Sequence, residues 1–96
     1  MTPDAFLSSL AQDAPPPLAP ALQALWREGK GDWDGAHRCV TDADDPAAMW
    51  VHAFLHRKEG DAANAAYWYR RAGQALATGP HDAEWRTIAE ALLAAS

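Results

Sequence analysis

The chain has 96 residues, of which 49% are hydrophobic, and its formal net charge at pH 7 is −5. This length suits a single domain with one hydrophobic core. The negative charge argues against binding to the backbone of nucleic acids, so we expect no nucleic-acid partner. Alanine is abundant and β-branched residues are scarce, which favours helices over sheet. We therefore expect residues 1–96 to form one all-α domain.

Start and stop signals divide the chain into five or six predicted helices. The predicted N-cap residues are Thr2, Asp32, Asp45 and Asp61. The prolines at 15–17 are expected to form a stiff connector after the first helix. The predicted helices cover residues 3–12, 18–28, 33–41, 46–59, 62–73 and 80–95. Within the helix over 33–41, Gly35 suggests that a neighbouring backbone comes close.

Two six-residue segments of the chain repeat each other. Gly31-Asp32-Trp33-Asp34-Gly35-Ala36 aligns with Gly60-Asp61-Ala62-Ala63-Asn64-Ala65 at an offset of 29 residues, from Gly31 to Gly60. In each copy the glycine lets the chain reverse, the aspartate caps the next helix, and the final alanine lets two helices approach closely. Each copy therefore predicts a helical hairpin.

These hairpins resemble the helix-turn-helix units of tetratricopeptide (TPR) and Sel1-like repeats, although the repeat is shorter than the usual ~34 residues. The resemblance covers residues 18–74 and implies a compact right-handed array of TPR-like hairpins. Residues 1–17 would then be an N-terminal helix and proline-rich connector, and residues 75–96 a C-terminal capping helix. Residues 36–73, which contain Ala36-His37-Arg38-Cys39-Val40-Thr41-Asp42 and Trp50–Gly73, also resemble a set of short uncharacterised bacterial proteins. That second resemblance implies no activity.

The second hairpin carries the candidate binding residues. His52, His56 and Glu59 follow at i, i+4 and i+7 and share one face of a helix, and Asn64, Trp68 and Arg71 have the same spacing on the next helix. Arginine side chains match the geometry of carboxylate and phosphate, and aromatic rings concentrate binding energy. We expect a non-enzymatic module without a cofactor, which binds a protein, an acidic peptide or a small anionic ligand. The predicted binding residues are His52, His56, Arg57, Asn64, Trp68, Arg70 and Arg71.

Two other interpretations stay open. In the first, His52, His56 and Glu59 serve a small metal- or ligand-dependent enzyme, although the chain lacks a nucleophile motif and a glycine-rich phosphate loop. In the second, the same side chains only pack the helices, with Arg57 paired to Asp61 and Glu59 paired to a neighbouring arginine. A surplus of tryptophan that the fold leaves exposed would favour a homodimer.

The sequence also predicts where the protein resides. A lone cysteine, Cys39, is typical of a reducing compartment, and no run approaches the roughly 20 apolar residues of a membrane span. The segment Met1-Thr2-Pro3-Asp4 lacks the features of a signal peptide. We expect a cytoplasmic protein with no membrane partner.

Overall fold

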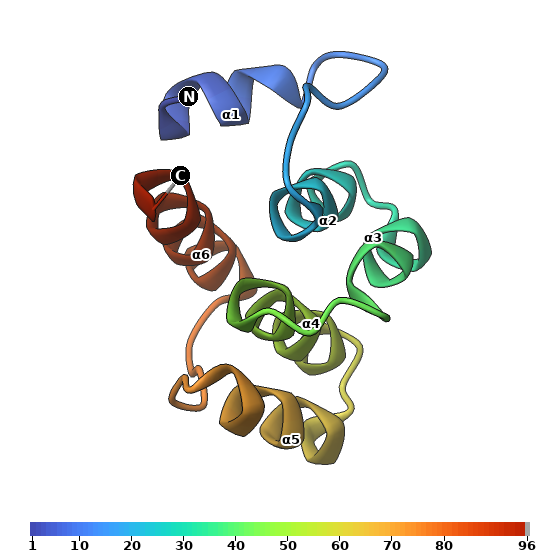
Figure 1. Ribbon diagram of the computed structural model, residues 1–96, viewed down its shortest axis with the longest axis vertical. Helices are drawn as coiled ribbons and strands as arrows, with labels where there is room; N and C mark the ends of the chain where they lie inside the picture. Colours follow the sequence, from blue (N-terminus) through green and yellow to red (C-terminus); the bar gives the residue numbers. More distant parts are fainter. Residues whose placement is uncertain (96) are drawn as a thin grey trace.

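The computed structural model describes residues 1–95, and these contain six α-helices and no strand (Figure 1). The all-α fold with five or six helices is thus confirmed. The helices are α1 (Pro3–Ser9), α2 (Pro20–Gly29), α3 (Trp33–Val40), α4 (Pro46–Lys58), α5 (Ala62–Ala72) and α6 (His81–Ala95). The largest difference from the predicted bounds is at α1, which ends at Ser9 instead of residue 12. There the amides of Leu10, Ala11 and Gln12 bond to carbonyls three residues earlier, so the last turn tightens.

The repeated Gly-Asp turns build two helical hairpins, α2–α3 and α4–α5. Gly31 and Gly60 have φ values of 84° and 89°, a left-handed conformation that glycine adopts without strain. The carboxylate of Asp32 caps the amide of Gly35, and that of Asp61 caps the amide of Asn64. The hairpins therefore form for the predicted local reasons. Their membership of the TPR class stays a prediction.

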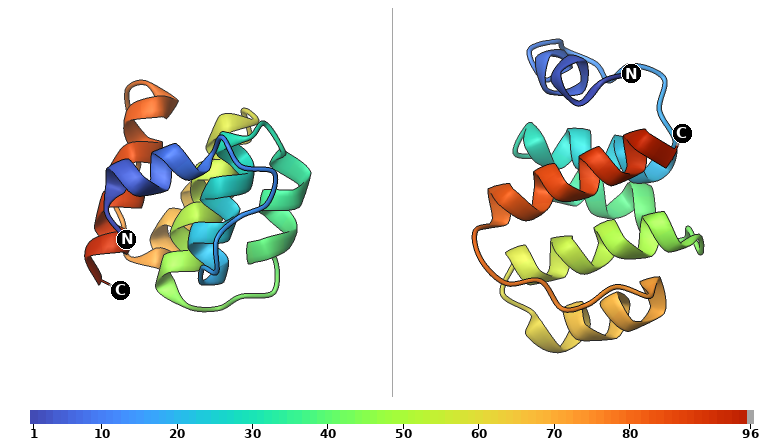
Figure 2. Two further views of the ribbon diagram at one scale, coloured as in Figure 1. Left: turned by 90° about the horizontal axis from the view of Figure 1, so that it is seen from above. Right: turned by 90° about the vertical axis from the view of Figure 1, so that its left-hand side faces the viewer.

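The second helix of the first hairpin and the first helix of the second hairpin pack together. As a result α4 occupies the centre of the fold and contacts α2, α3, α5 and α6 (Figures 1 and 2). Its buried side chains lie all around the helix, from Ala48 to His56. The start of α1 and the end of α6 lie near each other, at the end of the molecule opposite α5 (Figure 2). No helix in residues 1–95 is both long and apolar enough to cross a bilayer.

Tryptophan side chains connect the helices through their indole N–H groups. Each of three indoles donates across a helix boundary while its ring contributes to the main core. The bonds run from Trp26 to Ser9 Oγ, from Trp33 to the Leu55 carbonyl and from Trp85 to the Leu25 carbonyl, at 3.1, 2.8 and 2.9 Å. All five tryptophans are buried or half-buried. The tryptophan side chains therefore form no exposed patch, and the reason for predicting a homodimer does not apply.

The buried Glu84 carboxylate holds α6 against the second hairpin through one ion pair and one hydrogen bond. The Arg57 guanidinium lies 2.8 Å from the Glu84 carboxylate, which also accepts a hydrogen bond from the Tyr69 hydroxyl. Burial, and then the hydrogen bond to Glu84, raises the pKa of Tyr69. The predicted Arg57–Asp61 pair is therefore wrong, because α6 supplies a more enclosed carboxylate. Glu59 likewise pairs with His56 instead of an arginine.

The expectation for Gly35 is also wrong in its cause. The three atoms nearest to a Cβ atom placed on Gly35 all belong to the Asp32 side chain, and none to a neighbouring backbone. A Cβ atom on Gly35 would instead collide with the carboxylate of Asp32, which folds over the first turn of α3 as its cap. Glycine is needed here because of local capping, and the contact between helices does not require it.

Candidate functional site

Three histidine side chains, one from the first hairpin and two from the second, converge between α3 and α4. His37 belongs to α3, whereas His52 and His56 lie one turn apart on the buried part of α4. One ring nitrogen from each of the three lies within 4.8 Å of the other two. The Nε2 atoms of His37 and His52 are 3.1 Å apart. We call His37, His52 and His56 the imidazole cluster.

The hydrogen bonds of His37 fix which ring nitrogen carries its proton. Its Nδ1 lies 3.1 Å from Thr41 Oγ1, and the Thr41 hydroxyl donates to the backbone carbonyl of His37 at 2.6 Å. Because that hydroxyl proton is already used, Thr41 Oγ1 accepts from His37 Nδ1–H. In this tautomer the Nε2 atom of His37 has a free lone pair, and it points at His52.

His56 is oriented in the same way by a carboxylate. Its Nδ1 lies 2.7 Å from Glu59 Oε1. An ionised carboxylate only accepts hydrogen bonds, so the proton is on Nδ1 and the lone pair is on Nε2. A carboxylate on the outer nitrogen is the usual arrangement behind a metal-bound histidine, where it fixes the tautomer and strengthens the ligand.

His52 is the most enclosed member of the imidazole cluster, with 4% of its surface exposed. Since His37 Nε2 has a lone pair, His52 Nε2–H donates to it, which leaves a lone pair on His52 Nδ1. This Nδ1 is the one buried side-chain nitrogen or oxygen in residues 1–95 that has no hydrogen-bond partner. Buried polar atoms are seldom unpaired, and a missing ion or water is a common reason.

Two of the three imidazoles, those of His37 and His52, are held in the neutral form at pH 7. Burial, followed by the neighbouring His37 and His56, lowers the pKa of His52 to about 4. Burial and His56 likewise lower the pKa of His37. Desolvation disfavours the imidazolium form, and three adjacent imidazoles disfavour a positive charge on any one of them. Neutral imidazole is the form that binds metal ions.

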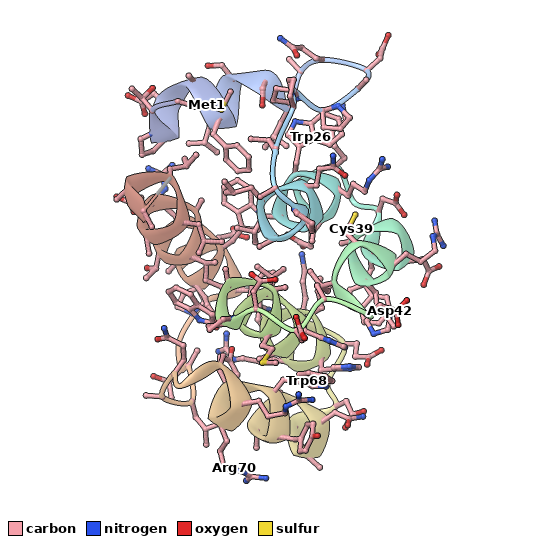
Figure 3. The ribbon with its side chains drawn as sticks, viewed as in Figure 1. Met1, Trp26, Cys39, Asp42, Trp68 and Arg70 are labelled. Carbon is pink, nitrogen blue, oxygen red and sulfur yellow. The ribbon has the colours of Figure 1, made fainter. Side chains whose placement is uncertain are left out.

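Two tryptophans flank the imidazole cluster. The ring of Trp68 stacks on His52 with centroids 4.0 Å apart, and the ring of Trp33 stacks on His37 at 4.9 Å. Trp68 reaches the space between α4 and α5 from α5 (Figure 3). The guanidinium of Arg71 makes a cation–π contact with the Trp68 ring, at 4.9 Å from the ring centroid. The rings shield the imidazoles from water and limit the size of anything that reaches them.

The fold gathers part of the predicted binding set and disperses the rest. His52, His56 and Trp68 belong to the cluster or its wall, and Arg71 contacts it through Trp68. Arg57 points instead into the α4–α6 contact, where it also donates to the Gly79 carbonyl. Asn64 donates to the Asp61 carboxylate at 2.7 Å. Arg70 is exposed and points away from the body of the molecule (Figure 3).

Glu59 does not lie in the position of a metal ligand beside His52 and His56, as the alternative prediction of a metal site required. It lies behind His56 as a hydrogen-bond partner and is outside the three-histidine group. A second group of possible ligands joins His56, Glu59 and Asp61, but its carboxylates are already bonded to His56 and Asn64. The three histidines therefore make the better-prepared site.

The sequence reasoning missed His37 and Trp33 as site residues. Both lie in the first hairpin, whereas the predicted binding residues all lie in the second. A signal was present, since Trp33, His37 and Thr41 follow at i, i+4 and i+8, the spacing that singled out His52 and His56. A cavity of about 290 Å³ lies elsewhere, lined by residues such as Leu10, Lys58 and Trp85. It includes no member of the imidazole cluster.

No protein-family model matches the chain, and the searches of curated proteins and of solved structures found no match. The imidazole cluster is therefore the feature from which we infer a function.

Proposed function

We propose that this protein is a small helical metal-binding domain that holds one divalent transition-metal ion on His37, His52 and His56. The observation that carries the proposal is the convergence of three imidazoles, with one ring nitrogen of each within 4.8 Å of the others. Buried His52 also has a second ring nitrogen, Nδ1, without a hydrogen-bond partner, and this atom can take the proton displaced from Nε2 when the ion binds.

The distances suit a metal ion of this class. Zinc binds imidazole nitrogen at about 2.0–2.1 Å, so two nitrogens in a tetrahedral site lie about 3.3 Å apart. The Nε2 atoms of His37 and His52 are 3.1 Å apart. One ring nitrogen of His56 lies within 4.8 Å of the ligand nitrogens of both His37 and His52. Metal binding requires His52 to shift its proton from Nε2 to Nδ1 when it coordinates through Nε2.

The groups behind the ligands also favour the proposal. Thr41 holds the proton of His37 on Nδ1, and Glu59 does the same for His56. Both rings therefore present Nε2 with no change of tautomer. Such outer partners typically contribute 10–100-fold to metal affinity.

The donor set narrows the choice of ion. Imidazole nitrogen suits zinc, copper, nickel and cobalt better than magnesium or calcium, which prefer oxygen. The thiol of Cys39 is not part of the site, because its Sγ atom lies 3.9 Å from the Gln23 amide oxygen on the side of α3 toward α2 (Figure 3). We expect Zn²⁺ and Co²⁺ to bind, and Mg²⁺ and Ca²⁺ not to bind.

The test is a metal titration with a matched histidine control. Protein stripped with a chelator is titrated with Zn²⁺ by calorimetry, and the bound ion is counted by elemental analysis after gel filtration. His37→Gln and His56→Gln should each abolish the equimolar binding. His81→Gln should leave it unchanged, because His81 lies on α6 against Phe54 and outside the cluster. Equal binding by the His37→Gln and His81→Gln proteins would refute the proposal.

A second candidate is the predicted binding module for a protein or acidic peptide. One observation favours it. Tyr67 is 43% exposed on α5, and the Arg71 guanidinium lies 5.6 Å from its ring. An aromatic ring beside an arginine is typical of binding surfaces. Loss of partner capture in a Tyr67→Ala protein that still binds Zn²⁺ would separate this role from the metal site.

A further inference from the structure

We infer that the metal ion on the imidazole cluster keeps an open fourth coordination position, which takes a small anion from solvent. The inference rests on the proposed metal site and says what that site binds. The chemical class is a monodentate anion of the size of hydroxide, azide or formate.

The first argument is the number of protein ligands. Within residues 1–95 no cysteine, aspartate, glutamate or further histidine joins the three imidazoles within ligand distance of one another. The nearest carboxylate, that of Glu59, is engaged with His56 Nδ1 on the far side of that ring. Zinc prefers four ligands in a tetrahedron, and a site with three protein ligands leaves the fourth position to solvent or substrate. A site built only for structure would close the tetrahedron with a fourth side chain.

The second argument is charge. Three neutral imidazoles do not offset the 2+ charge of the ion, whereas carboxylate or thiolate ligands would. Arg71 adds a positive charge beside the cluster, since its guanidinium lies 4.9 Å from the Trp68 ring that stacks on His52. Two carboxylates also lie near the cluster: that of Glu59 is bonded to His56 Nδ1, and that of Asp34 lies one turn before His37 on α3. Neither of them neutralises the ion by direct contact, so an anion in the fourth position is favoured.

The third argument concerns access and size. His52 and His56 are buried, but His37 is half-buried and its neighbours Asp34 and Thr41 are exposed. Solvent therefore reaches the cluster along the α3 side. The Trp33 and Trp68 rings flank the imidazoles at stacking distance. Rings in these positions restrict the space beside the imidazoles, which favours a small ligand over a bulky one.

The experiment uses the full chain loaded with Co²⁺, whose visible absorption reports the ligands of the ion. We expect azide to shift the bands saturably, with one azide bound per cobalt and the cobalt retained on gel filtration. Arg71→Gln should weaken azide binding severalfold while Co²⁺ still binds. Arg70→Gln should leave azide affinity unchanged, because Arg70 points away from the cluster.

The outcomes separate the inference from the proposed function. If Co²⁺ binds at one equivalent and azide leaves its spectrum unchanged, the fourth position is closed and the inference fails while the metal site stands. If azide removes the cobalt from the protein, the inference also fails, because the anion then competes with the imidazoles instead of joining them. If Co²⁺ does not bind at all, both proposals fail.

Discussion

The Nε2 atoms of His37 and His52 lie 3.1 Å apart although 15 residues separate them in the chain. His37 belongs to the second helix of the first hairpin, and His52 to the first helix of the second hairpin. The imidazole cluster therefore exists only where the two hairpins pack against each other. A ligand that joins these histidines must also join the hairpins, which links metal binding to the stability of the fold.

Zinc should raise the thermal stability of the protein. An ion that binds only the folded state at 100 times its dissociation constant adds about 2.7 kcal/mol, which corresponds to a rise of about 10–20 °C in Tm for a chain of this size. Circular dichroism melts with Zn²⁺ or with EDTA measure the shift. The His81→Gln protein should show the full shift and His37→Gln should lose it. A Tm that zinc does not move in the wild-type protein would contradict a link between the site and the fold.

The metal-free protein should lose stability as the pH falls from about 7 to 4. The pKa of His52 is about 4 in the folded protein and 6.5 in the unfolded chain, so the unfolded chain takes up the proton first. Stability is therefore lost as the pH falls through 6.5 toward 4, by about 2 kcal/mol for this group. Urea unfolding in EDTA at pH 7 and pH 4.5 tests the expectation.

The control for the pH dependence is His52→Gln, which has no titrating ring at this position. Carboxylates contribute equally to acid destabilisation in both proteins, so the difference between them isolates His52. An equal loss of stability in the wild-type and variant proteins would show that His52 is not held neutral by the fold.

Glu59→Gln should weaken zinc binding without unfolding the protein. The carboxylate orients His56 and increases the basicity of its Nε2, and loss of such a partner typically lowers metal affinity 10–100-fold. Competition with a chromogenic chelator measures the affinity. Glu90→Gln on the exposed face of α6 is the matched control and should bind as the wild type does. Wild-type affinity in Glu59→Gln would mean that His56 needs no orienting partner.

Arg57→Met should destabilise the fold but spare the metal site. The change leaves the Glu84 carboxylate, whose side chain is 6% exposed, without its cation, and breaking one side of a buried pair typically costs about 3–5 kcal/mol. Urea unfolding measures the loss, and the double variant Arg57→Met, Glu84→Gln should recover part of it. Zinc affinity should not change, because Arg57 faces α6. Weaker zinc binding by a folded Arg57→Met protein would contradict this expectation and show that Arg57 contributes to the binding site.

Much of the fold could be predicted because its determinants are local. The Gly-Asp turns and the aspartate caps depend on residues within one turn of a helix, and Asp32 and Asp61 cap as predicted. Long-range partners could not be predicted in this way. Glu84 lies 27 residues beyond Arg57, and its enclosure against α4 takes precedence over the nearby Asp61.

In the candidate site, too, local relationships could be predicted and long-range ones could not. His52 and His56 were found because their spacing places both on one face of a single helix. His37 was missed because only the packing of α3 on α4 brings it to them. Periodicity shows which side of a helix a residue occupies and not which helix lies opposite.

The ring nitrogens of the histidines test the central claim most directly. In uniformly ¹⁵N-labelled protein, long-range ¹H–¹⁵N spectra resolve the ring nitrogens of all four histidines. One equivalent of Zn²⁺ should move one ring nitrogen each of His37, His52 and His56 to the metal-bound range, and should leave His81 unchanged. Unchanged ring nitrogens in the three clustered histidines at one equivalent of Zn²⁺ would contradict the metal site.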